Sequence, residues 1–421
     1  MADEDLLQKV HGLEDLDLAA LLCLISREHC IVSTEADELD NLIEELRLVA
    51  SDTFDLKSAV VDCTPSTTLD DLAASIQLPP PTPQPQLHPQ TPRTPSASPL
   101  RRRGTTDSST YFRGNNAATA STPATATTPP QIANVILAKN LDHAPKDVQI
   151  QCLELLRTRR ILTRTSVQTA PKQFLFVAVL ESNGAGRLVS HLNDLFYVSH
   201  WHDPEDGFAH LEEADGADDD DKRGGETASL DSASSVVRRS FAESTPMVTG
   251  TPRQGVNRSR SRQNSKREEQ VIADDKSFSH SSTRSSAFPS ITKSDIASLA
   301  QLARQVNLDV DVLRYQMNIV SFLRMHRAVA PAGGGVTPQA TKHFDQLSKC
   351  LAALHGLDYV TPSLVGLAAK KVYPHRIRIV TPEKERSMQW GSQLAAVEAL
   401  LDGVDAEYVI EDVLGMVDAP L

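Results

Sequence analysis

The stretch "ANVILAKNLDHAPKDVQIQCLELLRTRRI", residues 133–161, decides the fold. Its opening "ANVILA" is dominated by apolar residues and predicts a buried strand, and a helix follows with Pro145 in its first turn. Three other apolar runs, "HCIVS", "SAVVDCT" and "KQFLFVAVL", alternate with helical segments in the same way. Strands that are apolar throughout must be covered on both faces. The pattern therefore predicts an α/β fold built on a parallel sheet.

Two segments of biased composition interrupt this alternation. Residues 78–130 are rich in Pro, Thr and Ser, and residues 214–289 pass from "DGADDDDK" into "RQGVNRSRSRQNSKREEQ". Both contain too few apolar residues to offset the entropy of ordering a chain, so we predict that they are disordered linkers. The remainder has three predicted parts. A core consists of residues 1–77 and 131–213, a helical domain covers residues 290–380, and a helical extension covers residues 381–421.

Several segments outside the strands have helical periodicity and recognisable ends. "LEDLDLAALLCLISR" places its leucines on one broad apolar face. We expect Ser66 or Thr67 to cap the helix of "STTLDDLAASI" and Ser294 to cap that of "SDIASLAQLARQV". Gly356 is expected to close the helix of "TPQATKHFDQLSKCLAALHGLDYV".

The composition restricts the class of protein. A formal charge of −13 disfavours a general binder of nucleic acid, although residues 100–104 and 253–267 are locally basic. Five cysteines without CxxC spacing predict reduced, buried thiols and no metal site. No leader sequence and no membrane-spanning apolar run is recognisable. We therefore expect a soluble protein of the cytoplasm, the nucleus or both.

Two stretches are similar to a known family. "LAKNLDHAPKDVQIQCLELLRTRRI" is similar to the family's "LADEINRAPPKVQ…LLEAM.ERQV", and "GLDYVTPSLVGLAAKKVYPHRI" is similar to its "GRDYVTPEDV…HR". The chain thus resembles the AAA+ ATPases of the magnesium chelatase subunit I and MoxR group. This resemblance implies a P-loop-NTPase-like AAA+ core, interrupted by the linkers, and a mainly α-helical AAA lid domain.

The resemblance places a phosphate-binding loop after "HCIV", where the residue types differ from the family's. Such a loop uses glycines to wrap backbone N–H groups around phosphates, a lysine for charge and a Ser or Thr for magnesium. Here the glycine positions hold Thr34, Asp37 and Leu39, the lysine position holds Asp40, and the Ser/Thr position holds Asn41. Asp40 in place of a lysine turns attraction for a polyphosphate into repulsion, and each unit charge at about 4 Å contributes roughly 4 kcal/mol at an effective dielectric of about 20. No nucleotide cofactor is therefore expected.

The family's other catalytic positions differ as well. Lys139 and Asn140 replace the two acids that would hold magnesium and orient water, and Asp142 is a weak substitute that is more typical of a helix cap. Leu195 occupies the position of the arginine finger, and Gln339 that of the sensor 2 arginine. Asn183 could serve as sensor 1, although an Asn beside glycine is also typical of a turn.

Four histidines lie close together beside acidic residues, at His191, His200, His202 and His210. Histidines and carboxylates can bind a metal ion. The family resemblance implies an ordinary sequence at this place, so packed or solvated side chains are favoured and no metal site is predicted.

The linkers contain residues that fit protein kinases. The candidates for phosphorylation precede proline or follow arginine, and they are Thr91, Thr94, Ser98, Ser240 and Ser265. A phosphate at these positions would change the charge of a linker without requiring a fold.

Two functions follow from these observations. The first is a catalytically degenerate AAA+ protein that acts as a non-hydrolysing scaffold or regulator and binds protein partners, an active AAA+ ATPase among them. The alternative is an active ATPase of the magnesium chelatase type, for metal insertion or MoxR-like remodelling, working within a complex with ATP and Mg²⁺. An oligomer is compatible with both. Nucleic-acid association through "RSRSRQNSKR" is disfavoured by the acidic run before it.

Overall fold

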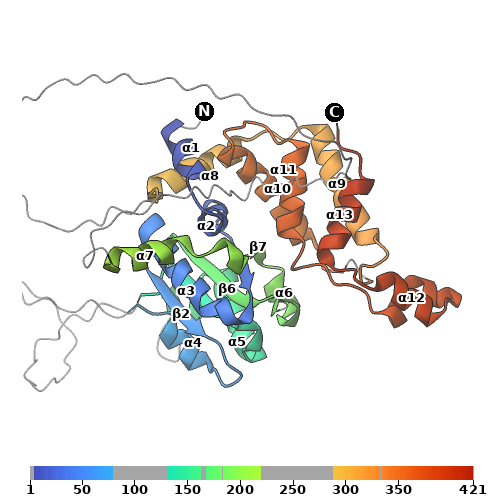
Figure 1. Cartoon of the computed structure of the whole chain (residues 1–421), viewed down its shortest axis with the longest axis horizontal. Coiled ribbons are helices and arrows are strands. Elements are labelled where there is room, and N and C mark those ends of the chain that lie inside the picture. Colours follow the sequence, from blue (N-terminus) through green and yellow to red (C-terminus); the bar gives the residue numbers. More distant parts are fainter. Residues whose placement is uncertain are drawn as a thin grey trace, which may run out of the picture.

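The computed structural model describes residues 4–78, 131–162, 167–182, 184–219, 288–331 and 334–420. Its core contains a five-stranded parallel sheet with the strand order β2-β3-β6-β1-β7 (Figure 1). The strands are β1 (His29–Thr34), β2 (Ser58–Asp62), β3 (Val135–Lys139), β6 (Leu175–Glu181) and β7 (Phe196–Trp201). The first four are the predicted strands, so the α/β prediction is confirmed.

Some short elements were not predicted. The edge strand β7 pairs with β1 and has only a short apolar run, because Ser199 and His200 follow Val198. A separate antiparallel hairpin joins β4 (Arg160–Leu162) to β5 (Val167–Thr169). Strands this short leave almost no periodic signal in a sequence.

Helices cover both faces of the sheet, as the apolar strands require. The first face carries α2 (Asp15–Ser26), α3 (Leu39–Leu48) and α7 (Ala209–Asp219). The second carries α4 (Leu69–Ser75), α5 (Lys146–Thr158) and the short α6 (Ser190–Asn193). Alternate strand residues divide between the two layers, so that Val32 belongs to the first apolar cluster and Ile31 to the second. This double burial supplies the main stabilising contribution.

A helical lid packs on the core through α2. It consists of α8 (Lys293–Gln305), α9 (Val310–Met325), α10 (Pro338–Leu354), α11 (Pro362–Val372), α12 (Leu394–Leu401) and α13 (Ala406–Met416). The unpredicted α1 (Glu4–His11) adds Leu6 and Val10 to the same apolar cluster. Helix α2 contacts β1 and β7 as well as α8 and α10, which explains why most of its residues are buried. One apolar cluster thus runs from the sheet into the lid.

Two predicted helix caps are wrong by a few residues. Helix α4 is capped by Thr68, not by Ser66 or Thr67, and α8 is capped by Thr292, not by Ser294. In both helices an aspartate at the third position bonds back to the cap, which selects that threonine over its neighbours. The predicted end of α10 is confirmed, because Gly356 follows it with φ +68°.

The chain segments that flank the two largest gaps meet each other. Leu78 N donates to Gln131 O at 2.9 Å, beside an antiparallel bridge between Gln77 and Ile132. At the other gap, the rings of His210 and Phe288 lie 3.9 Å apart between centroids. The described residues on the two sides of each gap therefore lie close together.

Several predictions lie outside the described residues. These are most of both linkers, Asn183, and the phosphorylation candidates Thr91, Thr94, Ser98, Ser240 and Ser265. Helix α7 continues to Asp219, past the expected boundary after residue 213. No helix in the described parts of the chain is long and apolar enough to cross a membrane.

Candidate functional site

An ion pair occupies the carboxyl edge of the sheet, where the phosphate loop was expected. Lys139 is the last residue of β3, and its Nζ donates to Oδ1 of Asp40 in the first turn of α3. The Asp40 side chain is 84% exposed, whereas that of Lys139 is 18% exposed. The cation therefore comes from the strand end and the anion from the helix start, which reverses the charges of a phosphate loop facing an acidic strand end.

The loop between β1 and α3 is a short 3₁₀ turn, Ala36–Glu38. Thr34 and Leu39 are buried, and the Thr34 hydroxyl has no hydrogen-bond partner among the described residues. Asp37 and Asn41 are exposed, and Asn41 Nδ2 donates to Glu38 at 2.6 Å. The residues of this loop present carboxylates to solvent and contribute no cation that would attract a polyphosphate.

Asp142 points into the core instead of capping a helix. It lies in a 3₁₀ turn, Leu141–His143, that follows Asn140 with φ +52°. Its side chain is 1% exposed, and Oδ2 lies 2.8 Å from Nε of Arg187. The interpretation of Asp142 as a helix cap is wrong, because α5 begins after Pro145 and has no side-chain cap. The ion pair with Arg187 engages Oδ2, and Oδ1 is buried without a hydrogen-bond partner among the described residues.

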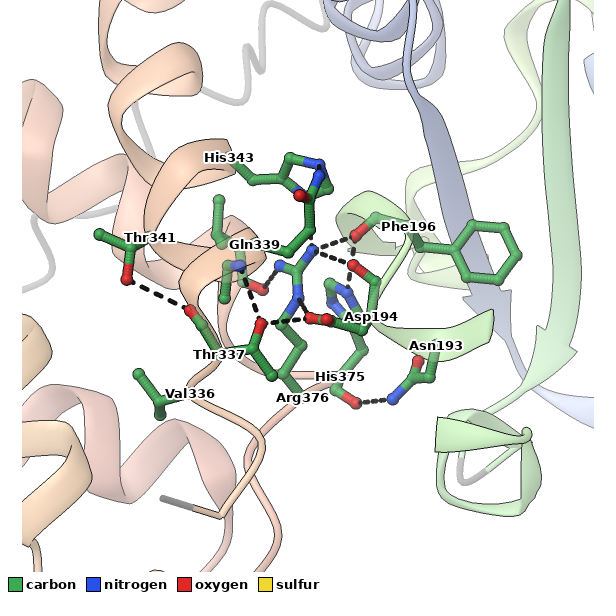
Figure 2. A network of polar contacts seen from close by, with 12 residues as sticks. Asn193, Asp194, Phe196, Val336, Thr337, Gln339, Thr341, His343, His375 and Arg376 are labelled. Atoms are coloured by element: carbon green, nitrogen blue, oxygen red, sulfur yellow. Dashed lines mark hydrogen bonds and ion pairs between the residues drawn. The ribbon is translucent and has the colours of Figure 1, made fainter. Parts of the chain in front are cut away.

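A polar network joins the lid to the core and is centred on Arg376 (Figure 2). Arg376 is 2% exposed and follows α11. Its guanidinium donates to the Phe196 carbonyl, to the Asp194 carbonyl at 3.2 Å and to Nδ1 of His343 at 2.7 Å. Burial lowers the pKa of Arg376 to about 10, with Asp194 opposing the shift, so the group stays charged at neutral pH.

Neighbouring residues extend this contact between lid and core. Thr337 Oγ1 donates to Oδ1 of Asp194 at 2.6 Å, and His375 Nε2 lies 3.1 Å from the Phe196 carbonyl oxygen. Asn193 Nδ2 donates to the His375 carbonyl at 2.5 Å (Figure 2). The start of β7 is thus held by groups from two separate lid segments.

The positions of the finger and of sensor 2 both lie beside this network. Leu195 is partly buried against the apolar cluster on the second face of the sheet. Gln339 lies in the first turn of α10, with Nε2 2.6 Å from Nε2 of His343 (Figure 2). In the sequence, "HR" stands only as the end of the motif that is similar to the family's. Nothing in the sequence indicates that Arg376 is buried, because arginine is usually an exposed residue.

The four clustered histidines do not converge on one site, although the rings of His200 and His202 lie 6.4 Å apart between centroids. His191 is exposed, His200 Nδ1 lies 3.3 Å from Lys371 Nζ, and His202 Nε2 lies 3.0 Å from the Gly207 carbonyl. His210 Nε2 lies 3.1 Å from Asp17 Oδ2 in the core. Within the parts of the chain that the structure describes, no group of three or more His, Cys, Asp or Glu is arranged to hold a metal ion.

Comparisons with known proteins relate this architecture to the AAA+ fold. Residues 325–397 match the family model described as AAA lid domain. A crystal structure of a protein from Cytophaga hutchinsonii, described as a candidate ATPase, superposes with a TM-score of 0.54 at 14% identity and covers 99% of this chain and 94% of that one. This likeness, together with the parallel sheet and the lid, shows the predicted fold class.

Curated relatives match a shorter part of the chain. A Kluyveromyces lactis protein named "Maintenance of telomere capping protein 2" is 30% identical over 96 residues, which are 22% of this chain and 35% of that protein. A protein of the same name from Lachancea thermotolerans is 28% identical over 103 residues, or 24% and 36% of the two chains. The match spans about a third of the relatives' length.

Proposed function

We propose that this chain, with its AAA+ fold and AAA lid domain, is a non-hydrolysing scaffold or regulator that binds protein partners. Within the AAA+ fold we place it with the magnesium chelatase subunit I and MoxR group, on the two stretches of similar sequence. An active AAA+ ATPase is one kind of partner that this placement suggests.

The ion pair between Lys139 and Asp40 supports this proposal most strongly. ATP binding at such an edge needs a cation and open backbone amides at the helix start and an anion for magnesium at the strand end. Here each end carries the opposite charge, and the two charges neutralise each other. A triphosphate would have to break this pair and then meet Asp37 and Asp40.

The buried position of Asp142 supports the same conclusion. A general base must reach the water that attacks the phosphate. The Asp142 carboxylate is instead enclosed by the core and paired with Arg187. Freeing it would separate a buried carboxylate from its half-exposed cation, which is unfavourable.

The lid network gives a reason to expect a role in assembly. In a hydrolysing enzyme the contact between lid and core would change with the bound nucleotide. Here the buried guanidinium of Arg376 bonds to the Asp194 and Phe196 carbonyls across this boundary. Moving the lid would leave this cation without its partners, so the contact favours one lid position and constant surfaces for partners.

The names of the curated relatives suggest where such a scaffold works. The two relatives are named for the maintenance of telomere capping, so we propose that this chain also acts in the nucleus. The linkers contain candidate phosphorylation sites that follow arginine, such as Ser240, or precede proline, such as Thr91. Phosphorylation at these sites would then allow kinases to regulate partner binding.

Calorimetric titration of the purified chain with Mg·ATP tests the proposal. We expect no binding tighter than about 1 mM. Micromolar binding, or ATP turnover that an Asp142→Asn substitution abolishes, would overturn the proposal in favour of an active ATPase. The turnover assay should also include partners captured with the intact chain, because a complex could supply missing groups.

A further inference from the structure

A groove opens on the lid, on the side of α9 that faces α13. Its volume is about 530 Å³, and it is bounded by the end of α9, the segment after α12 and one side of α13. Figure 1 shows α13 beside α9, with α12 at the outer end of the lid. None of the residues that line the groove belongs to the sheet edge or bonds to Arg376, so the proposed function assigns the groove no role.

Large apolar side chains line this groove and remain exposed. They are Phe322 at 39%, Met325 at 60%, Leu400 at 43%, Tyr408 at 55% and Met416 at 51% exposure. On α13, Tyr408, Asp412 and Met416 follow one another at four-residue spacing and form one stripe. Exposed apolar side chains that gather in a concave surface mark an interaction site, and flexible methionines suit the apolar face of a helix.

The surface around the groove is strongly acidic. From Ser387 to Leu421 the sequence contains no Lys, Arg or His, and it has seven acids: Glu398, Asp402, Asp405, Glu407, Glu411, Asp412 and Asp418. Glu398, Asp402 and Asp418 are exposed and make no ion pair within the described parts of the chain. Of the cations near the groove, His326 pairs with Asp412 and Arg327 with Glu385, each at 3.0 Å, whereas Arg386 donates to the Met325 carbonyl at 3.4 Å.

We propose that this groove binds a basic amphipathic helix of a partner protein. Its apolar stripe, with residues at i, i+3 or i+4, and i+7, enters between α9 and α13 and contacts Met325, Tyr408 and Met416. Its lysines and arginines lie beside the groove and face the exposed Asp402, which stands between the lining residues Leu400 and Val404. Acidic flanks exclude an acidic helix, since like charges repel. The inference deepens the proposed scaffold function, on which it rests, by naming the class of partner.

Model peptides test the proposal on the full chain. The probe is a fluorescent amphipathic peptide of about five helical turns built from Leu and Lys. Its controls are a scrambled peptide of the same composition, which has no apolar stripe, and a Leu/Glu peptide with inverted charge. We expect the Leu/Lys peptide to bind at least about tenfold more tightly than either control, measured by fluorescence anisotropy.

Substitutions locate the binding site. The double substitution Tyr408→Ala with Met416→Ala removes exposed side chains, and we expect it to weaken binding about tenfold or more. Asp402→Asn should reduce the dependence of affinity on salt. The matched control, Leu69→Ala with Ile150→Ala, removes equally exposed apolar side chains from α4 and α5 and should leave binding unchanged.

Other occupants predict different results. Equal binding of the Leu/Glu peptide, or no effect of the Tyr408→Ala/Met416→Ala pair, would overturn the proposal. So would a dimer in sedimentation that this pair dissolves, because a second copy would then fill the groove. Neutralising the arginines of residues 253–267 must not increase peptide affinity tenfold, since that result would identify the chain's own basic tract as the occupant. The Mg·ATP titration on the same preparation tests the proposed function independently.

Discussion

Arg376 Nε and Asp194 Oδ1 lie 3.5 Å apart across the boundary between lid and core, although 182 positions separate the two residues in the sequence. The guanidinium is almost fully buried and also bonds to backbone carbonyls on the core side. A buried cation is tolerated only where partners surround it. The lid must therefore remain in this position for the arginine to stay satisfied, which couples the stability of the two parts.

Replacement of Arg376 by methionine should destabilise the protein by about 3–5 kcal/mol, because the carboxylate of Asp194 loses its buried cation. Urea denaturation measures the free energy of unfolding. The matched control is Arg314→Met, which breaks an exposed i,i+3 pair with Asp311 and should change stability by less than about 0.5 kcal/mol. Equal effects of both substitutions would show that Arg376 does not hold the lid.

Two glycines of the lid should respond to alanine in opposite directions. Gly335 has φ +98°, and a Cβ there would lie 1.8 Å from the carbonyl oxygen of Arg376. Gly335→Ala should therefore cost at least about 2 kcal/mol. Gly366 lies within α11, and an added methyl group there would meet nothing within 4 Å, so Gly366→Ala should stabilise by up to about 1 kcal/mol. Thermal unfolding of both variants gives the comparison.

The free energy of unfolding should decrease at acidic pH, because two buried histidines become protonated when the chain unfolds. Burial, reinforced by Arg159, lowers the pKa of His29 to about 3, and burial with Arg376 lowers the pKa of His343 to about 3. An unfolded histidine titrates near 6.5. Their contribution is therefore complete above pH 6.5 and is lost as the pH falls from 6.5 towards 3, by about 2 kcal/mol for each histidine at pH 5.

Urea denaturation at pH 7 and pH 5 measures this loss. His29→Asn keeps an acceptor for the Phe176 amide and should flatten the dependence, whereas His191→Asn, at an exposed position, should not. Glu28 acts in the opposite direction, because burial raises its pKa to about 7 and its contribution is lost as the pH rises. The difference in pH dependence between the His29→Asn and His191→Asn variants gives the contribution of His29. An identical pH dependence of stability in both variants would contradict the prediction.

The pair of Lys139 and Asp40 should contribute little to stability. Asp40 is largely exposed, so solvent screens the attraction. A double-mutant cycle with Lys139→Met and Asp40→Asn should give a coupling free energy below about 1 kcal/mol. A much larger coupling would mean that the pair holds the sheet edge together in addition to closing it to anions.

The sequence predicted the sheet where burial leaves a strong pattern. Runs such as "LFVAVL" in β6 are apolar on both faces, so their alternation with helices indicated a parallel sheet. Helix α1 was missed because only Leu6 and Val10 are buried among polar neighbours. The edge strand β7 was missed because its outer half is polar.

The sequence indicated the residue type at single positions of the candidate site, but not which of these residues contact each other. Resemblance identified Asp40 and Lys139 separately as misplaced charges, but no local spacing indicates that residues 99 positions apart pair with each other. Asp142 was interpreted as a cap because its surroundings in sequence fit one; its partner Arg187 comes from the loop after β6. Contacts of this kind depend on how the strands are ordered in the sheet.

The two places where the chain leaves the core and comes back have a consequence for its evolution. Leu78 N is hydrogen-bonded to Gln131 O, and His210 near the second gap contacts Phe288, so the described residues on the two sides of each gap lie close together. The number of residues within each gap therefore makes little difference to the packed domain. Doubling a loop costs only about 0.6 kcal/mol. Related chains can therefore differ greatly in length at these points, and a reporter domain could be grafted there without disturbing the sheet.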